Sequence, residues 1–148
     1  MHARFKGAIA TSMLWASLSQ GAHACDRWLL RPFTLTQSNG FKVNVNVSGP
    51  VVRGDANYET KDGWVQATMS NGTLTTNHLH FLLAWENGTV GIYDVDIDDS
   101  GRLQNGKTYD RDNPGSKGSW TTGVKFKCCV TTPRPTCASG RACGNYCV

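Results

Sequence analysis

Two short segments of the chain carry residue types that bind metal ions. His78 and His80 are separated by one residue, as are Asp94 and Asp96. Side chains two positions apart in a strand share a face, so a hairpin loop at 86–88 would set each histidine opposite one aspartate. Two imidazoles and two carboxylates could bind a divalent metal ion and so serve a metal-dependent enzyme. The alternative is that the same residues form cross-strand ion pairs that face solvent and need no metal. We favour the ion pairs, and expect no cofactor, because apolar residues share this face.

The segment 96–103 resembles the first half of a calcium-binding loop. Acids stand at its first and third positions, a glycine at its sixth and an aliphatic residue at its eighth. The twelfth position, which supplies a bidentate acid in such loops, is Lys107. We therefore interpret the segment as an acidic hairpin turn, with weak calcium binding as the alternative.

Tryptophan and tyrosine side chains are the candidates for ligand binding. Aromatic rings at the mouth of a β-barrel take up sugars or small apolar ligands, although aromatic residues more often belong to the core. Alternation along the sequence assigns Trp85 and Tyr93 to the packed face. The other candidates are our predicted ligand contacts: Trp28, Trp64, Tyr109 and Trp120.

Signatures of common enzyme classes are missing from the sequence. It has no G-x-S-x-G elbow, no H-E-x-x-H zinc motif, no phosphate-binding loop and no G-x-G-x-x-G fingerprint. The acids between residues 94 and 112 form too weak a pattern to define a pair of glycosidase carboxylates. The sequence therefore leans against an enzyme.

The elements that would position these residues are β-strands. In the segment 41–48, apolar side chains alternate with polar ones, which gives a strand one dry and one wet face. Turn-like tripeptides ending in glycine separate strand-like segments near residues 30–37, 41–48, 51–59, 64–69, 73–85, 89–98, 103–109 and 118–127. We predict an all-β fold, an antiparallel up-and-down meander of about eight strands that closes into a small barrel. A two-sheet sandwich is the alternative.

The register of the hairpins follows from the side chains that each register would bury. With a loop at 86–88, residue 85 faces residue 89, and the apolar residues of both strands share one face. A two-residue turn would instead place Asp94 and Asp96 among apolar side chains, at a cost of several kcal/mol each. We therefore predict the three-residue loop. The same rule sets residue 37 opposite residue 41 in the first hairpin.

The N-terminus has the three parts of a cleavable signal peptide. Two basic residues precede an apolar run at 7–18, which is too short to span a bilayer, and Ala22 and Ala24 provide the small residues that signal peptidase reads. We expect cleavage after Ala24 and a secreted or periplasmic product. A lipid anchor on Cys25 and an N-terminal amphipathic helix are the alternatives. The lipid anchor would require a Leu-like residue three positions before Cys25, and the sequence has none there. The amphipathic helix would require a helix cap, which is also missing.

All the cysteines follow the expected cleavage site, and an even number in an exported chain favours disulfides. The sequence has no C-x-x-C pair for zinc, and a catalytic thiol would leave one cysteine unpaired. One bridge should tie the N-terminus to the C-terminal segment, and the two adjacent cysteines should bond different partners. The predicted disulfide residues are Cys25, Cys128, Cys129, Cys137, Cys143 and Cys147.

The chain therefore divides into three parts. We expect a signal peptide at 1–24, a barrel domain at 25–127 and a Cys-rich tail at 128–148 that packs on the barrel. The tail is too short to bury a core of its own, so its bridges must hold it.

The charge of the chain is close to balance. The formal charge is +4, and it falls to +2 once Arg4 and Lys6 leave with the signal peptide. This excludes nucleic acid as an expected partner. No acid follows Asp112, whereas five basic residues do: Lys117, Lys125, Lys127, Arg134 and Arg141. Solubility explains this asymmetry, and contact with an anionic envelope polymer is the alternative.

Two stretches resemble known protein groups. The residues Trp85–Tyr93, continuing through Gly106–Asp110 to Pro114, Ser116 and Trp120, resemble a meander pattern of small exported bacterial proteins. The tail Cys137–Val148 looks like a cysteine segment of exported proteobacterial proteins. Together they cover about half of the expected mature chain and imply a location and a class, with no assigned activity. The expected barrel is similar to lipocalin and avidin scaffolds in architecture only.

These observations together predict a secreted, non-enzymatic binding protein for a small ligand, a glycan or an envelope surface. A secreted inhibitor or effector that docks on a partner protein is the first alternative. A metal-dependent enzyme using His78 and His80 is the second. No segment after the signal peptide is long and apolar enough to be a membrane helix.

Overall fold

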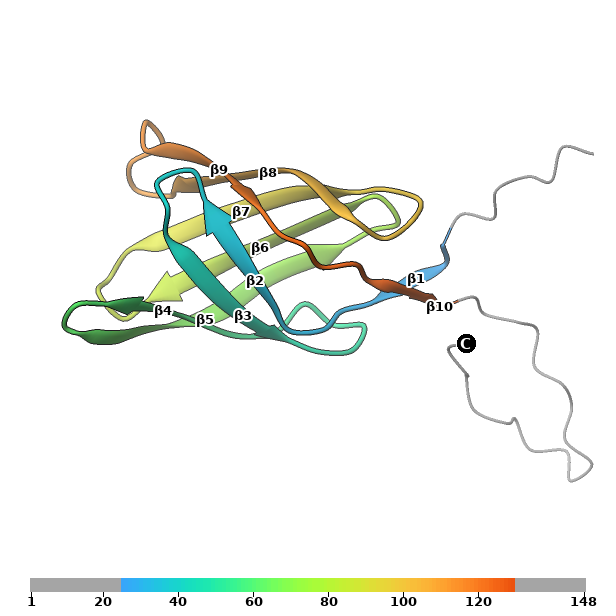
Figure 1. Ribbon diagram of the computed structural model, residues 1–148, viewed down its shortest axis with the longest axis horizontal. Coiled ribbons are helices and arrows are strands. Elements are labelled where there is room, and N and C mark those ends of the chain that lie inside the picture. The colour runs from blue at the N-terminus through green and yellow to red at the C-terminus, as the bar shows by residue number, and fades with distance from the viewer. Residues whose placement is uncertain (1–24, 130–148) are drawn as a thin grey trace, which may run out of the picture.

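The computed structural model describes residues 25–129, which form ten β-strands and no helix (Figure 1). Eight strands make a closed antiparallel barrel in which each pairs with its sequence neighbours and β2 closes on β9. They are β2 (Phe33–Gln37), β3 (Lys42–Val47), β4 (Gly54–Thr60), β5 (Gly63–Leu74), β6 (His78–Trp85), β7 (Val90–Ile97), β8 (Leu103–Asp110) and β9 (Lys117–Thr121). The predicted all-β meander and its closure into a barrel are confirmed.

Two further strands lie outside the barrel wall. β1 (Arg27–Leu29) and β10 (Lys127–Cys129) pair with each other in a small separate sheet (Figure 1). The predicted strand 118–127 is divided, because residues 122–126 leave the wall between β9 and β10. The first residues of the predicted tail thus belong to β10, while 1–24 and 130–148 lie outside the described residues. The alternation rule missed β1 and β10 because three residues are too few to show a period.

The predicted hairpin registers are confirmed. Across β6 and β7, Phe81 lies opposite Tyr93 and His80 opposite Asp94, as the three-residue loop requires. Across β2 and β3, Phe33 lies opposite Val45. Both registers keep apolar side chains inside the wall, and among the described residues no polar or charged residue is buried.

Aromatic rings run through the interior of the barrel. Phe126 meets Phe33 edge to face at 6.0 Å, and Phe33 stacks on Trp120 at 6.4 Å between ring centroids. Trp120 then contacts Tyr93, which stacks on Phe81 at 5.1 Å with the ring planes 4° apart. Each such pair contributes about 0.5–1.5 kcal/mol beyond area burial. These rings fill the barrel over most of its length, so it has a core and not a channel.

The Trp120 indole fits because its neighbour across the strand pair is Gly106. A Cβ at position 106 would lie 2.6 Å from Trp120 Cδ2. Pairing a large with a small residue is how narrow barrels accommodate their widest side chains.

No helix in the described part of the chain could cross a membrane.

Candidate functional site

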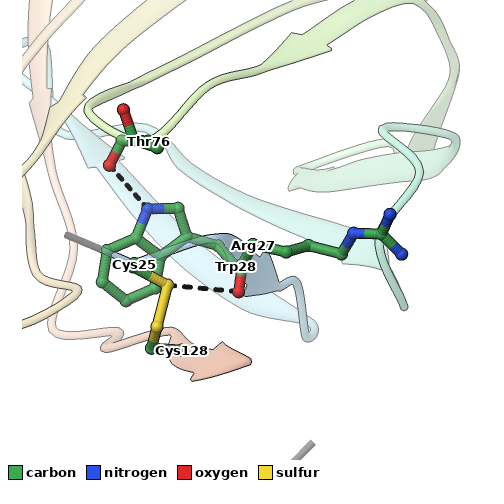
Figure 2. The surroundings of a disulfide bond; sticks show 5 residues. All are labelled: Cys25, Arg27, Trp28, Thr76 and Cys128. Atoms are coloured by element: carbon green, nitrogen blue, oxygen red, sulfur yellow. Dashed lines mark hydrogen bonds between the residues drawn. A yellow bond between two sulfur atoms is a disulfide. The ribbon is translucent and has the colours of Figure 1, made fainter. Parts of the chain in front are cut away.

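The two ends of the barrel differ, and the difference defines the candidate site. At the end that carries β1 and β10, the closed end, the indole of Trp28 is 2% exposed. Its Nε1 donates a hydrogen bond to the carbonyl oxygen of Thr76 at 2.7 Å (Figure 2). Gly101 leaves room for this ring, since a Cβ there would lie 2.9 Å from Trp28 Cζ3. Side chains therefore close the barrel interior at this end, and a surface hollow of about 460 Å³ lies outside the seal, lined in part by Trp28, Phe126 and Cys128.

A disulfide secures this seal. Cys25 and Cys128 are bonded, with their Cα atoms 5.5 Å apart, and join β10 to the residue that begins the described chain (Figure 2). Cys129 is also disulfide-bonded. The predicted bridge between the two ends of the domain is confirmed. The predicted partners Cys137, Cys143 and Cys147 lie outside the described residues.

The opposite end of the barrel is open, and we call it the mouth. The β2–β3, β4–β5, β6–β7 and β8–β9 loops surround it. Two hollows of about 170 and 210 Å³ lie here and share four lining residues. The first is lined by Gln37, Phe41, Val43, Tyr58, Trp85, Thr89 and Tyr93.

Three aromatic rings form one wall of the mouth. Phe41 meets Tyr58 edge to face at 5.6 Å, and Tyr58 meets Trp85 in the same way at 4.8 Å. Phe41 is 48% exposed, whereas Trp85 is largely buried. The rings thus descend from solvent toward the core and present apolar surface to a ligand.

The floor of the mouth is polar. Tyr93 is 2% exposed, and its hydroxyl accepts a hydrogen bond from Gln37 Nε2 at 3.1 Å. Burial raises the pKa of Tyr93 to about 12, although hydrogen bonds with Thr108 and Gln37 oppose the shift. The phenol therefore stays protonated at physiological pH. Gly91 makes room for it, because a Cβ there would lie 2.8 Å from Tyr93 Cε2.

The mouth thus combines apolar rings with neutral hydrogen-bonding groups. No charged side chain lines the first hollow, and the second has only Asp110 and Lys117. Asp110 Oδ1 already accepts hydrogen bonds from the backbone N–H groups of Asp112 and Asn113. Such a site favours a ligand that has both apolar faces and neutral polar groups.

The four predicted ligand contacts do not meet at the mouth. Trp28 seals the closed end, and Trp120 is buried in the core with its Nε1 donating to the Lys107 carbonyl at 2.9 Å. Trp64 is 53% exposed and lies opposite Glu59, on the outer face of β5. Only Tyr109 lines a hollow at the mouth.

Sequence reasoning missed Gln37, Phe41, Tyr58 and Thr89 as mouth residues. The signal was present, because inward-facing positions next to the predicted hairpin loops must surround one end of a closed meander. Aromatic residue type alone does not separate rings at the mouth from rings in the core.

The predicted histidine–aspartate cluster forms on the outer face of β6 and β7. His80 Nδ1 lies 2.8 Å from Asp94 Oδ1, and the two ring nitrogens of His78 lie 3.2 Å from Asp94 and 3.3 Å from Asp96. A hydrogen bond from Asn105, followed by one from His78, lowers the pKa of Asp96. Within residues 25–129, no group of three His, Cys, Asp or Glu side chains is arranged to hold a metal ion. The contacts that the structure does show are cross-strand hydrogen bonds between the imidazoles and the carboxylates.

The calcium-like segment is a closed turn. Asp98 Oδ1 accepts hydrogen bonds from the backbone N–H groups of Ser100 and Arg102, at 2.9 and 3.0 Å, and Oδ2 accepts one from Gln104. The bond from Arg102, followed by that from Ser100, lowers the pKa of Asp98 to about 2. The carboxylate is therefore committed to the turn, as its sequence interpretation implied.

No protein-family model matches the chain, and no curated protein or solved structure is significantly similar to it. The fold and the site therefore define only a class, a plugged eight-stranded barrel with one open mouth.

Proposed function

We propose that this protein is an exported, non-enzymatic carbohydrate-binding protein whose mouth takes one neutral sugar residue. The observation that carries the proposal is the pairing of the Phe41–Tyr58–Trp85 wall with the Gln37–Tyr93 floor. A sugar ring has apolar C–H faces that pack on aromatic rings and hydroxyl groups at its edge that hydrogen-bond. Both kinds of contact are offered within one hollow.

An apolar ligand fits this mouth less well. It would cover the partly exposed Gln37 amide without offering that amide a further hydrogen-bond partner. Covering an unsatisfied polar group costs about 1–3 kcal/mol. Each hollow is also smaller than the roughly 300 Å³ at which ligand pockets usually begin. Room for one ring accords with a single sugar residue.

Export supports a carbohydrate partner. The signal peptide expected at residues 1–24 would deliver the mature chain to an envelope or an extracellular space, where glycans are abundant. The Cys25–Cys128 disulfide is compatible with such an oxidising location.

The test is glycan binding by the oxidised protein, first on a printed array and then by calorimetry on the glycans retained. Phe41→Ala should weaken binding about tenfold, since it removes the outermost ring of the wall. Its exposure at 48% means that stability should change little. Matched controls are Trp64→Ala and Val51→Ala, which remove side chains 53% exposed that do not line the mouth.

Two outcomes would contradict the proposal. One is the retention of no glycan by a protein that is folded and oxidised. The other is equal weakening by Phe41→Ala and Trp64→Ala, which would move the binding surface to the outer wall.

A further inference from the structure

The mouth continues over the barrel rim into a second hollow. A groove of about 360 Å³ lies on the outside of β8 and β9, and we call it the rim groove. It shares four lining residues with the mouth: Thr108, Tyr109, Lys117 and Gly118. Tyr109 and Lys117 form the last pair between β8 and β9, so the wall ends where the two hollows join. A ligand longer than one sugar residue has a continuous path from the mouth to the outer face.

The rim groove is lined by ordered side chains and bordered by a loop that backbone hydrogen bonds hold in place. Its lining includes the half-buried Tyr109 ring and Pro114 of the β8–β9 loop. Backbone hydrogen bonds fix this loop, with Arg111 N donating to Val90 O at 2.8 Å and Ser116 N donating to Asn113 O at 2.9 Å. The loop therefore holds its shape without a ligand, which favours binding.

The charges along the rim groove leave a positive excess. Lys107 and Lys117 line it, are exposed and have no ion-pair partner in the described part of the chain. Asp94 also lines it, but its Oδ1 lies within 3.2 Å of ring nitrogens of His78 and His80. At the adjoining rim, the Asp110 carboxylate accepts backbone hydrogen bonds. Two lysines and one aspartate therefore line the groove, a formal charge of +1, and both lysines are exposed to an anion in solution.

We infer that the ligand is an acidic oligosaccharide, with a neutral residue in the mouth and a carboxylate-bearing sugar in the rim groove. The inference rests on the proposed function and adds the charge and the length of the ligand. The Tyr109 ring provides an apolar surface for the acidic residue, and Lys107 and Lys117 flank its carboxylate. A free monosaccharide would use the mouth alone.

Matched glycan pairs test the inference. We would compare acidic oligosaccharides that carry uronic acid residues with the same oligosaccharides after carboxyl reduction, which removes the charge and preserves the chain. The acidic member should bind roughly threefold to tenfold more tightly at low salt. The advantage should disappear at about 0.5 M salt, where exposed charges are screened.

Substitutions locate the effect. Lys107→Gln with Lys117→Gln should abolish the advantage of the acidic member and leave the affinity for its reduced partner unchanged. Lys107→Glu with Lys117→Glu should reverse the preference. The matched control is Lys42→Gln with Lys61→Gln, two exposed lysines at the same end of the barrel that line neither hollow.

The outcomes separate this inference from the proposed function. Suppose that acidic and reduced glycans bind equally and that Phe41→Ala weakens both. This result would contradict the acidic site in the rim groove and would still support glycan binding at the mouth. An acidic preference that survives the Lys107 and Lys117 substitutions would also overturn the acidic site. Failure of every glycan to bind would overturn the proposed function itself.

Discussion

The closed end and the mouth are built from similar residues and differ in what covers them. At the closed end, Trp28 crosses the barrel opening and β1 and β10 hold it there through backbone pairing. At the mouth, Phe41 lines the opening, and none of the strands within residues 25–129 lies across it (Figure 1). Trp28 and Trp85 therefore differ in role. Trp28 closes the barrel interior and lines a surface hollow of about 460 Å³ outside it, whereas Trp85 belongs to the wall of the mouth.

This difference shows how a small barrel divides stability from binding. At the closed end, a disulfide, a buried indole and the turn at Gly101 lie together and stabilise the fold. The residues that we propose to contact a ligand line the mouth, where Phe41 is 48% exposed and Gln37 is partly exposed. Changes at one end should therefore leave the other largely intact.

The largest expected effect comes from the disulfide. Replacing Cys25 and Cys128 with serine removes a crosslink between residues 103 positions apart, worth about 4–5 kcal/mol in the chain-entropy model. Urea denaturation should show this loss in the free energy of unfolding. Glycan affinity, measured well below the new midpoint, should be unchanged. Loss of affinity in a variant that remains fully folded would show that the two ends are coupled.

A pair of glycine substitutions compares the ends directly. At position 91, a Cβ would lie 2.8 Å from the Tyr93 ring, so Gly91→Ala should displace the ring and break its bond to Gln37. At position 101, a Cβ would lie 2.3 Å from the Phe126 carbonyl oxygen and 2.9 Å from the Trp28 ring, and φ is +84°, a conformation that side chains disfavour. Each substitution should cost about 1–3 kcal/mol of stability. Only Gly91→Ala should also lower the glycan affinity measured by calorimetry. An equal loss of affinity in both variants would contradict the separation of binding at the mouth from stability at the closed end.

The smallest effect is a pH dependence at the closed end. Because hydrogen bonds depress the pKa of Asp98 to about 2, its carboxylate stabilises the β7–β8 turn above the unfolded value near 3.8. That contribution is lost as the pH falls through about 2. Asp98→Asn should therefore flatten the pH dependence of stability between about pH 4 and 2 in thermal melts. Asp99→Asn, which alters an exposed neighbour, is the control and should keep the slope.

Local patterns were sufficient to predict most of the fold. The alternation in 41–48 and the cost of burying Asp94 and Asp96 required the observed registers, because a slip of one residue would invert both faces of a strand. The same registers placed His78 and His80 beside the two aspartates. Elements of three residues, such as β1 and β10, carry no such pattern, and their pairing depends on the chain ends meeting.

The candidate site was less predictable than the fold. Trp120 and Trp28 have the same residue type as Trp85, yet only Trp85 lines the mouth. Inward or outward direction is a property of the strand, whereas depth along the barrel axis depends on strand tilt and closure. Sequence alone therefore gave the face of each ring but not its depth.

By itself, the sequence determined the strand order, the hairpin registers and the need for a disulfide between the two ends of the domain. These follow from interactions between near neighbours and from the few ways of keeping charges out of a core. The tertiary structure alone decided which end Trp28 seals, that Phe41 and Tyr58 meet Trp85, and that Lys107 and Lys117 flank a groove continuous with the mouth. The physical reason is closure, which brings β2 beside β9 and sets distant residues around a common opening.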